Sequence, residues 1–156
     1  MRVRIIAVGT RMPAWVDAAV DDYARRLRTQ WKFELLEIAA AKRSASRSAE
    51  RAAAAEGERV LAALRPGEQA IALDERGVAM TTRELAARLA TGERDGRDLA
   101  LLVGGPDGHA PAVRQRATEA WSLSKLTLPH GLARVLLAEQ LYRAQSLLLN
   151  HPYHRD

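Results

Sequence analysis

The sequence lacks cysteine, and this absence alone excludes several classes of protein. Without thiols the chain can carry no disulfide framework, no thiolate zinc site and no cysteine nucleophile. Aromatic residues make up only 4% of the chain, but 47% is hydrophobic and 28% charged, which is the balance of a soluble globular protein. No apolar run approaches the roughly 20 residues that cross a bilayer. With 156 residues, we expect one domain spanning residues 1–156 and no membrane partner.

The N-terminal segment favours a cytoplasmic protein. Residues 1–9 place two arginines before an apolar run that is too short and too β-branched for a secretory leader, and no small-residue cleavage site follows. We therefore expect this segment to form a first buried strand.

Basic residues outnumber acidic ones by 24 to 19, which gives a net charge of +5. Such an excess suits an anionic partner such as nucleic acid, although the prevalence of arginine equally fits the codon composition of the source genome. One segment stands out, because Lys42, Arg43, Arg47 and Arg51 lie there among alanine and serine. It is either a basic loop that contacts phosphates or a solvated connection.

Short strand-like runs alternate with longer helical ones along the chain. This alternation predicts an α/β fold with a mostly parallel sheet. The predicted strands are 3–8, 33–38, 69–73, 98–103 and 123–128, with a turn at 74–77 after the third. The predicted helices include one that opens at Pro13, one over 48–64, one over about 83–90 and a strongly amphipathic one over 132–150.

Two segments are candidates for binding a nucleotide-like cofactor. Gly104 and Gly105 follow an apolar strand directly, and at the carboxyl end of a parallel strand such a pair lets the backbone approach a ligand. A tight turn before a helix explains the same pair. Residues 123–128 offer backbone amides and hydroxyls beside an apolar wall, as an adenosine site requires, but an edge strand explains them as well.

All four histidines lie late in the chain, and their spacing matches no metal motif. The C-terminal tail is more informative. A terminus is expected to fray, yet this one carries Tyr153, His154 and Arg155, whose side chains stack on bases, exchange protons and pair with phosphates. A solvated basic tail is the alternative.

The last predicted helix offers both an ion pair and an apolar stripe. Glu139 and Arg143 stand four residues apart, in the order that favours a surface ion pair. The stripe is wide enough to serve as core, as a subunit interface, or as both. Its members are Leu136, Leu137, Gln140, Leu141, Ala144, Leu147 and Leu148.

Five segments together resemble the bacterial large-subunit rRNA methyltransferase H family, whose members are small SPOUT-class enzymes. They are 8–13 (VGTRMP), 104–108 (GGPDG), 123–130 (LSKLTLPH), 139–144 (EQLYRA) and 150–155 (NHPYHR). The resemblance covers nearly the whole chain. The departures lie in the alanine-rich helix and at residues 131–133, and they contain no predicted site residue.

The resemblance implies a specific activity and assembly. It implies a SPOUT fold whose C-terminal part forms a trefoil knot, and methylation of N3 of pseudouridine 1915 in 23S rRNA, in the ribosome, with S-adenosylmethionine as methyl donor. It also implies a homodimer in which each cofactor lies near the other subunit, with no metal and no DNA partner.

The resemblance further assigns roles to residues. The tail residues Tyr153, His154 and Arg155 are expected to serve catalysis and RNA binding, with His154 a candidate acceptor for the N3 proton. The residues expected to bind the cofactor are Leu73, Gly104, Leu123, Ser124, Lys125, Leu126, Thr127 and Leu128.

Two other functions remain open on the residues alone. A non-catalytic RNA-binding module would use the basic surface and the tail. A small-molecule nucleotide enzyme of doubly wound type would use the glycine loop, although the sequence lacks the G-x-G-x-x-G pattern of such enzymes.

Overall fold

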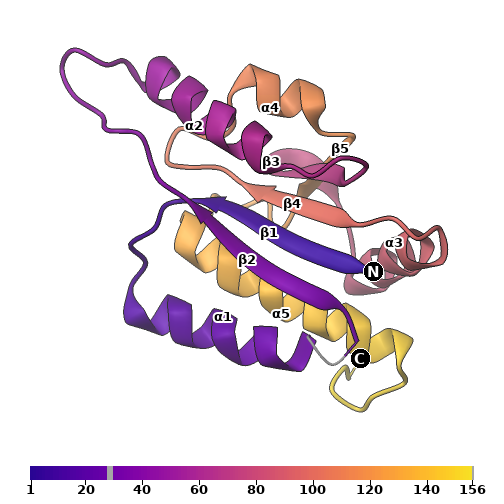
Figure 1. Ribbon diagram of the computed structural model, residues 1–156. Coiled ribbons are helices and arrows are strands. Elements are labelled where there is room, and N and C mark those ends of the chain that lie inside the picture. The colour runs from indigo at the N-terminus through magenta and orange to yellow at the C-terminus, as the bar shows by residue number, and fades with distance from the viewer. Residues whose placement is uncertain (28–29, 156) are drawn as a thin grey trace.

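The computed structural model describes residues 1–27 and 30–155, which form one parallel sheet with helices on both faces (Figure 1). The strand order is β2-β1-β4-β3-β5, and every neighbouring pair is parallel, as the sequence predicted. The strands are β1 (Arg2–Val8), β2 (Lys32–Ile38), β3 (Gln69–Ala79), β4 (Leu99–Val103) and β5 (Glu119–Ser122). The helices are α1 (Ala14–Leu27), α2 (Ala49–Ala63), α3 (Thr82–Arg94), α4 (Pro111–Arg116) and α5 (His130–Leu148).

Strand β4 and residues 5–8 of β1 are apolar because helices cover both faces of these central strands. Ile5 and Leu101 pack in the cluster beneath α1, α3 and α5, whereas Ile6 and Leu102 pack in the cluster beneath α2 and α4. Successive side chains of a strand point to opposite faces, so a strand buried on both sides reads as a continuous apolar run. No helix in the described part of the chain is long and apolar enough to cross a bilayer.

The predicted fifth strand is wrong in position. The strand that pairs with β3 is β5, Glu119–Ser122, and residues 123–129 form a loop. Two serines explain the difference. The Ser122 hydroxyl donates to the Ser124 carbonyl, and the Ser124 hydroxyl accepts from the Leu126 amide. Such local side-chain bonds compete with the hydrogen bonds of a strand ladder, so the chain turns.

Strand β3 is longer than predicted, because it continues to Ala79 beyond the expected turn. Its pairing with β5 shifts between Leu73 and Val78, so the intervening residues form a bulge rather than a chain reversal. A Cβ at Gly77 would lie 2.6 Å from the backbone carbon of Ala120, so only glycine fits there. The bulge places Asp74 and Glu75 beside the candidate site described below.

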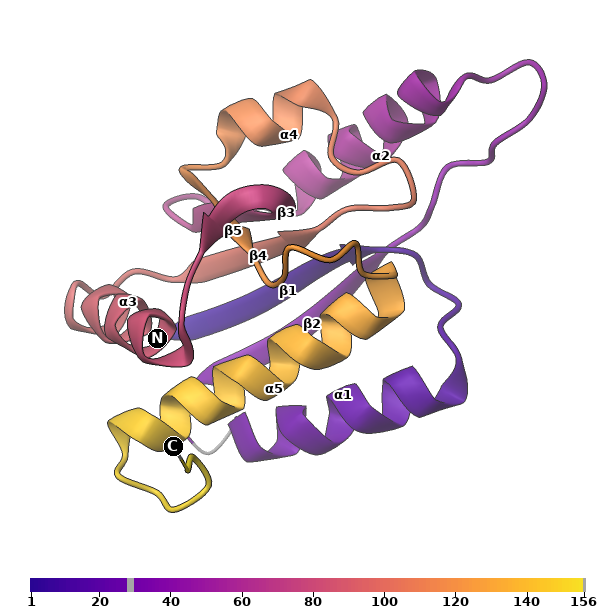
Figure 2. The ribbon, with the colours of Figure 1, turned by 180° about the vertical axis from the view of Figure 1, so that it is seen from behind.

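Helix α5 differs from the predicted amphipathic helix because it is covered on several sides. It packs against the sheet, α1 and α3 (Figures 1 and 2), and its buried residues include the polar Arg134, Gln145 and Ser146. The predicted ion pair is present, with Arg143 Nε 2.9 Å from Glu139 Oε1.

Arg134 joins α5 to the end of β1 from a fully buried position. Its side chain is 1% exposed, and its guanidinium donates to the carbonyls of Val8 (2.8 Å) and Gly9 (2.7 Å) and to the Glu37 carboxylate (2.8 Å). Breaking a buried charge pair leaves polar groups without partners.

We therefore expect Arg134→Met to lower the free energy of unfolding by about 3–5 kcal/mol. Urea denaturation measures this change. The matched control is Arg25→Met, since Arg25 is 70% exposed and pairs with Asp22 on the surface. A surface pair is worth at most about 1 kcal/mol. Equal losses for the two variants would contradict the structural role of Arg134.

Candidate active site

A cavity of about 730 Å³ opens between the bulge of β3 and the carboxyl end of β4. The bulge of β3, the loops after β4 and β5 and the first turn of α5 line it. Seven of the predicted cofactor residues meet there, namely Leu73, Gly104, Leu123, Ser124, Leu126, Thr127 and Leu128. Lys125 does not line the cavity and is exposed on the loop.

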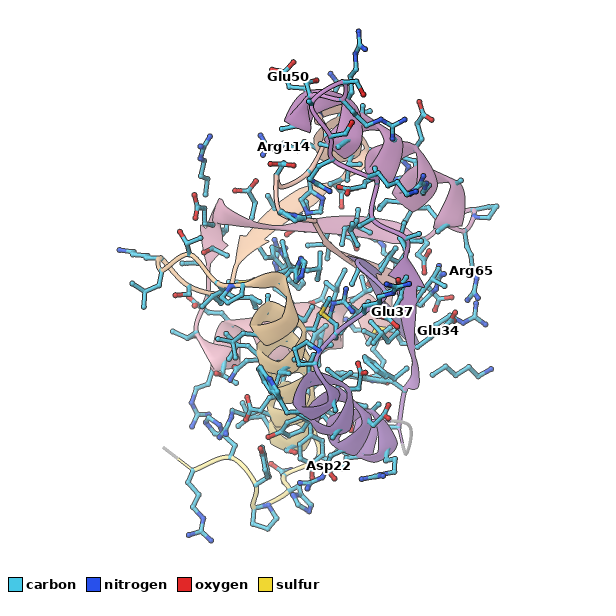
Figure 3. All side chains as sticks on the ribbon, turned by 90° about the vertical axis from the view of Figure 1, so that its left-hand side faces the viewer. Asp22, Glu34, Glu37, Glu50, Arg65 and Arg114 are labelled. Carbon is cyan, nitrogen blue, oxygen red and sulfur yellow. The ribbon has the colours of Figure 1, made fainter. Side chains whose placement is uncertain are left out.

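The cavity combines an apolar wall with a polar rim. Leu73, Val103 and Leu123 contribute the apolar side chains. On the rim, the Thr127 hydroxyl donates to Glu75 Oε2 at 3.0 Å. Arg114, labelled in Figure 3, pairs with Asp74 at 3.4 Å. The volume and lining suit a small organic ligand with a flat apolar part and a few polar groups.

The glycines after β4 are required because the loop packs closely against itself and against α2. The sequence had suggested another reason, the approach of the backbone to a ligand. A Cβ on Gly104 would lie 2.9 Å from the Gly108 carbonyl carbon, and one on Gly105 would lie 2.9 Å from Glu56 Oε2. Only Gly108 of this loop has a positive φ, 73°. The Gly108 amide also donates to the Gly105 carbonyl at 3.0 Å. The glycines thus let the loop close on itself beside the cavity.

His109 is a cavity residue that the sequence did not single out as such. Its ring is buried, and Nε2 lies 3.2 Å from the Leu73 carbonyl and 3.1 Å from the Leu102 carbonyl. Both partners are acceptors, so Nε2 carries the proton and ties the ends of β3 and β4 together. Burial lowers the pKa of His109 below its ordinary value. The feature of the sequence that could have identified His109 as a cavity residue is its position directly after the glycine loop.

This lowered pKa predicts a loss of stability in mild acid. The unfolded chain binds a proton at His109 below about pH 6.5, while the folded chain resists it, so the free energy of unfolding falls as the pH drops. The slope from one such group is at most about 1.4 kcal/mol per pH unit. Denaturation between pH 7.5 and 5 should show a flatter profile for His109→Gln than for the exposed control His151→Gln. Parallel profiles would contradict the assignment.

The C-terminal tail packs against α1 and α5 instead of fraying. The Tyr153 ring lies 4.6 Å from the Tyr142 ring, and its hydroxyl donates to Glu139 Oε1 at 3.1 Å. Burial raises the pKa of the Tyr153 phenol, so it is neutral at physiological pH. His154 is half-buried and Arg155 is exposed. The last residue, Asp156, lies outside the described residues, as do Arg28 and Thr29.

The structure does not bring the tail and the cavity of one chain together. No described tail residue lines the cavity. Glu139, where Tyr153 is held, stands nine residues after the cavity residue His130, which is roughly 13 Å along the helix. Figure 1 shows the C-terminus near the N-terminus, at the opposite edge of the sheet from the carboxyl ends of the central strands. The two halves of the predicted site are therefore separate within one protomer.

Comparison with known proteins identifies the family. A family profile described as "Predicted SPOUT methyltransferase" matches residues 1–154. Ribosomal RNA large subunit methyltransferase H of Methylococcus capsulatus is 52% identical over 155 residues, which cover 99% of this chain and all of that protein. The protein of the same name from Thioalkalivibrio sulfidiphilus is 53% identical over the full length of both chains. The chain belongs to this SPOUT methyltransferase family.

Solved structures agree with the SPOUT assignment at the level of the fold. A probable methyltransferase from Bordetella pertussis Tohama I superposes with a TM-score of 0.57 at 23% identity, over 92% of this chain and 93% of that one. A putative methylase family protein from Neisseria gonorrhoeae gives a TM-score of 0.56 at 17% identity, over 99% and 86% of the two chains. The predicted SPOUT fold is confirmed.

Proposed function

We propose that this chain methylates N3 of pseudouridine 1915 in 23S rRNA, with S-adenosylmethionine as the methyl donor. The observation that carries the proposal is the cavity beside the glycine loop, assembled from the family's motif positions in a chain that is half identical to rRNA large subunit methyltransferases. The net charge of +5 suits a polyanionic substrate. Such a substrate places the protein in the cytoplasm, with the ribosome.

The cavity fits S-adenosylmethionine in size and chemistry. Its apolar wall suits an adenine ring, and its hydroxyls and loop backbone suit a ribose and an amino acid group. The residues that would hold the cofactor are Leu73, Gly104 and the loop 123–128. Within this loop, Lys125 would take part through its backbone, because its side chain does not line the cavity. When bound, the cofactor supplies an electrophilic methyl group on a sulfonium. The protein's part is to exclude water and to hold the substrate nitrogen in line with that group.

In this proposal the tail residues act on the RNA, while the cavity holds the cofactor. His154 would accept the N3 proton of the base, because imidazole exchanges protons near neutral pH. Arg155 is exposed and would pair with a phosphate of the RNA. Tyr153, packed on Tyr142 and bonded to Glu139, would anchor the tail rather than act as a base.

A second copy of the chain would complete the site. Because the tail does not reach the cavity of its own chain, we propose a homodimer in which each tail serves the partner's cavity. Exposed apolar side chains near the cavity end of α1 and α5 support this proposal, since Trp15 is 57%, Leu132 40% and Leu126 74% exposed. A second copy would cover such side chains.

The assembly is testable by disrupting this apolar surface. We expect the wild-type protein to be a dimer at micromolar concentration, and Trp15→Asp with Leu132→Asp to shift it to a monomer without ribosome methylation. Light scattering coupled to gel filtration measures the mass, and circular dichroism checks the fold. An active monomer would contradict the proposal.

The reaction itself is tested by mapping the product. Unmodified ribosomes are incubated with the protein and tritiated S-adenosylmethionine, and the labelled nucleotide is located by nuclease digestion and mass spectrometry. We expect one methyl group at pseudouridine 1915, and none in ribosomes that carry uridine there. Label at another nucleotide would overturn the substrate assignment, and ribosome binding without label would indicate a non-catalytic RNA-binding module.

A further inference from the structure

A second hollow of about 760 Å³ lies over the segment between β2 and α2. Its lining is mostly basic and hydroxylic, with Lys42, Arg47, Arg51, Arg59, Ser44 and Ser46. Figures 1 and 2 show this segment projecting beyond the carboxyl ends of the strands, at the same edge as the loop after β4. We call it the basic hollow. It shares no lining residue with the candidate cofactor cavity.

The segment is held in a defined shape by one arginine whose charge is neutralised. Arg43 donates to Glu56 Oε1 at 2.8 Å and to Asp107 Oδ2 at 2.7 Å. Glu56, only 2% exposed, also accepts from the Ala41 amide at 3.0 Å. Because Asp107 belongs to the glycine loop, the basic segment is tied directly to the rim of the cofactor cavity.

The other cations of the hollow are not neutralised in this way. Among the residues that the structure describes, no carboxylate lies within ion-pair distance of Lys42, Arg47 or Arg51. All three are exposed. Arg59 donates to the Ala39 carbonyl at 2.6 Å and so keeps its full charge as well. Glu50, the acidic residue in the first turn of α2, lies at the outer tip of that helix (Figure 3).

Unneutralised like charges in one hollow repel one another unless an anion joins them. Guanidinium groups and serine hydroxyls donate in geometries that match phosphate oxygens. Three or more cations spread over one concave surface fit several phosphates of a chain better than a single small anion. RNA is the polyanion that the proposed function already requires at this edge of the molecule.

We infer that the basic hollow binds backbone phosphates of the RNA substrate, beside and separate from the cofactor cavity. This inference rests on the proposed function for its choice of polyanion. Lys42, Arg47 and Arg51 hold the RNA strand, while Arg43 fixes the segment that carries them against the glycine loop. The hollow is thus a positioning surface, which sets how tightly the substrate binds rather than how fast the bound base reacts.

The test compares two triple variants of equal charge. The first, Lys42→Gln, Arg47→Gln and Arg51→Gln, removes the cations of the hollow and leaves Arg43 in place. The control, Lys32→Gln, Arg94→Gln and Arg97→Gln, removes three exposed cations near the amino ends of the strands. Both lower the net charge from +5 to +2. The probes are unmodified ribosomes and a protein-free 23S rRNA fragment around position 1915.

We expect the first variant alone to lose affinity for both probes. Each lost phosphate contact removes about 0.7–0.9 from the slope of log affinity against log salt. Between 50 and 200 mM salt, the wild-type protein should therefore lose roughly 20–40-fold more affinity than the variant does. For the first variant, the KM for ribosomes should rise. Its kcat at saturating ribosomes and its Kd for S-adenosylmethionine should stay at the wild-type values.

Several results would overturn the inference. Equal RNA affinity for the two triple variants would show that only net charge matters. Loss of ribosome binding with unchanged binding to protein-free RNA would assign the hollow to a ribosomal protein. Calorimetric binding of inorganic phosphate with unchanged RNA affinity would assign it to a small anion. If RNA affinity falls as expected while the wild-type protein transfers no methyl group, the hollow stands and the proposed reaction fails.

Discussion

Removal of residues 153–156 should abolish methyl transfer to ribosomes while leaving S-adenosylmethionine binding nearly unchanged. The candidate cofactor cavity contains no described tail residue of its own chain, and the partner's tail is proposed to act on the RNA, so we expect the cofactor affinity to change little. The reaction depends on the tail, because the tail carries the imidazole proposed to take the N3 proton. A positioned general base contributes about 10²–10⁴-fold, so kcat should fall by at least about 100-fold. The measurement is tritium incorporation at several enzyme and ribosome concentrations.

Point variants separate chemistry from charge and anchoring in the tail. His154→Ala should reproduce much of the loss even at saturating ribosomes. Arg155→Gln should raise KM, an effect that more ribosome reverses. Tyr153→Phe retains the ring that packs on Tyr142 and loses only the hydroxyl bonds to Glu139 and Tyr23, so it should retain most activity. Full incorporation by the truncated protein would show that the tail takes no part in the reaction.

Gly104→Val should weaken S-adenosylmethionine binding by more than about 100-fold, which corresponds to about 2.7 kcal/mol. A Cβ at this position would lie 2.9 Å from the Gly108 backbone, so the loop must open, and the branched valine side chain worsens the conflict. Calorimetric titration with S-adenosylmethionine measures the effect.

The control for Gly104→Val is Gly96→Ala. Gly96 has a positive φ of 67° and open space around its Cβ position, so alanine strains the chain there without touching the cavity. It should cost about 1 kcal/mol of stability and leave cofactor binding at the wild-type level. If Gly104→Val binds the cofactor as tightly as this control, with an unchanged circular dichroism spectrum, the cavity is not the cofactor site.

The sequence was sufficient to predict the parallel sheet and most of the cavity. Strands such as β1 and β4 are buried on both faces, and their apolar runs have no other ready explanation. The cavity followed because loops at the carboxyl ends of neighbouring parallel strands meet at one edge. Seven of the eight predicted cofactor residues line it. The knot that the resemblance implies stays a prediction.

The contacts between distant residues could not be predicted from the sequence. The loop after β5 follows from two serine hydroxyl bonds, which an alternating pattern of leucine and polar residues does not reveal. The reason for Gly105 is a carboxylate on α2, Glu56, and the anchoring of the tail depends on Glu139 and Tyr142. Each of these partners is remote in sequence or lies on a face that the helical period alone does not specify.

Mixing two inactive chains shows whether two copies of the chain share each site. One chain lacks residues 153–156 and keeps its cavity, and the other carries Gly104→Val and keeps its tail. The two are unfolded together, refolded and assayed for methyl transfer to unmodified ribosomes. With random pairing, half of the dimers are mixed and each of these has one complete site of two, so we expect about one quarter of wild-type activity. No activity above that of the separate chains, with mixed dimers present by mass spectrometry, would contradict it.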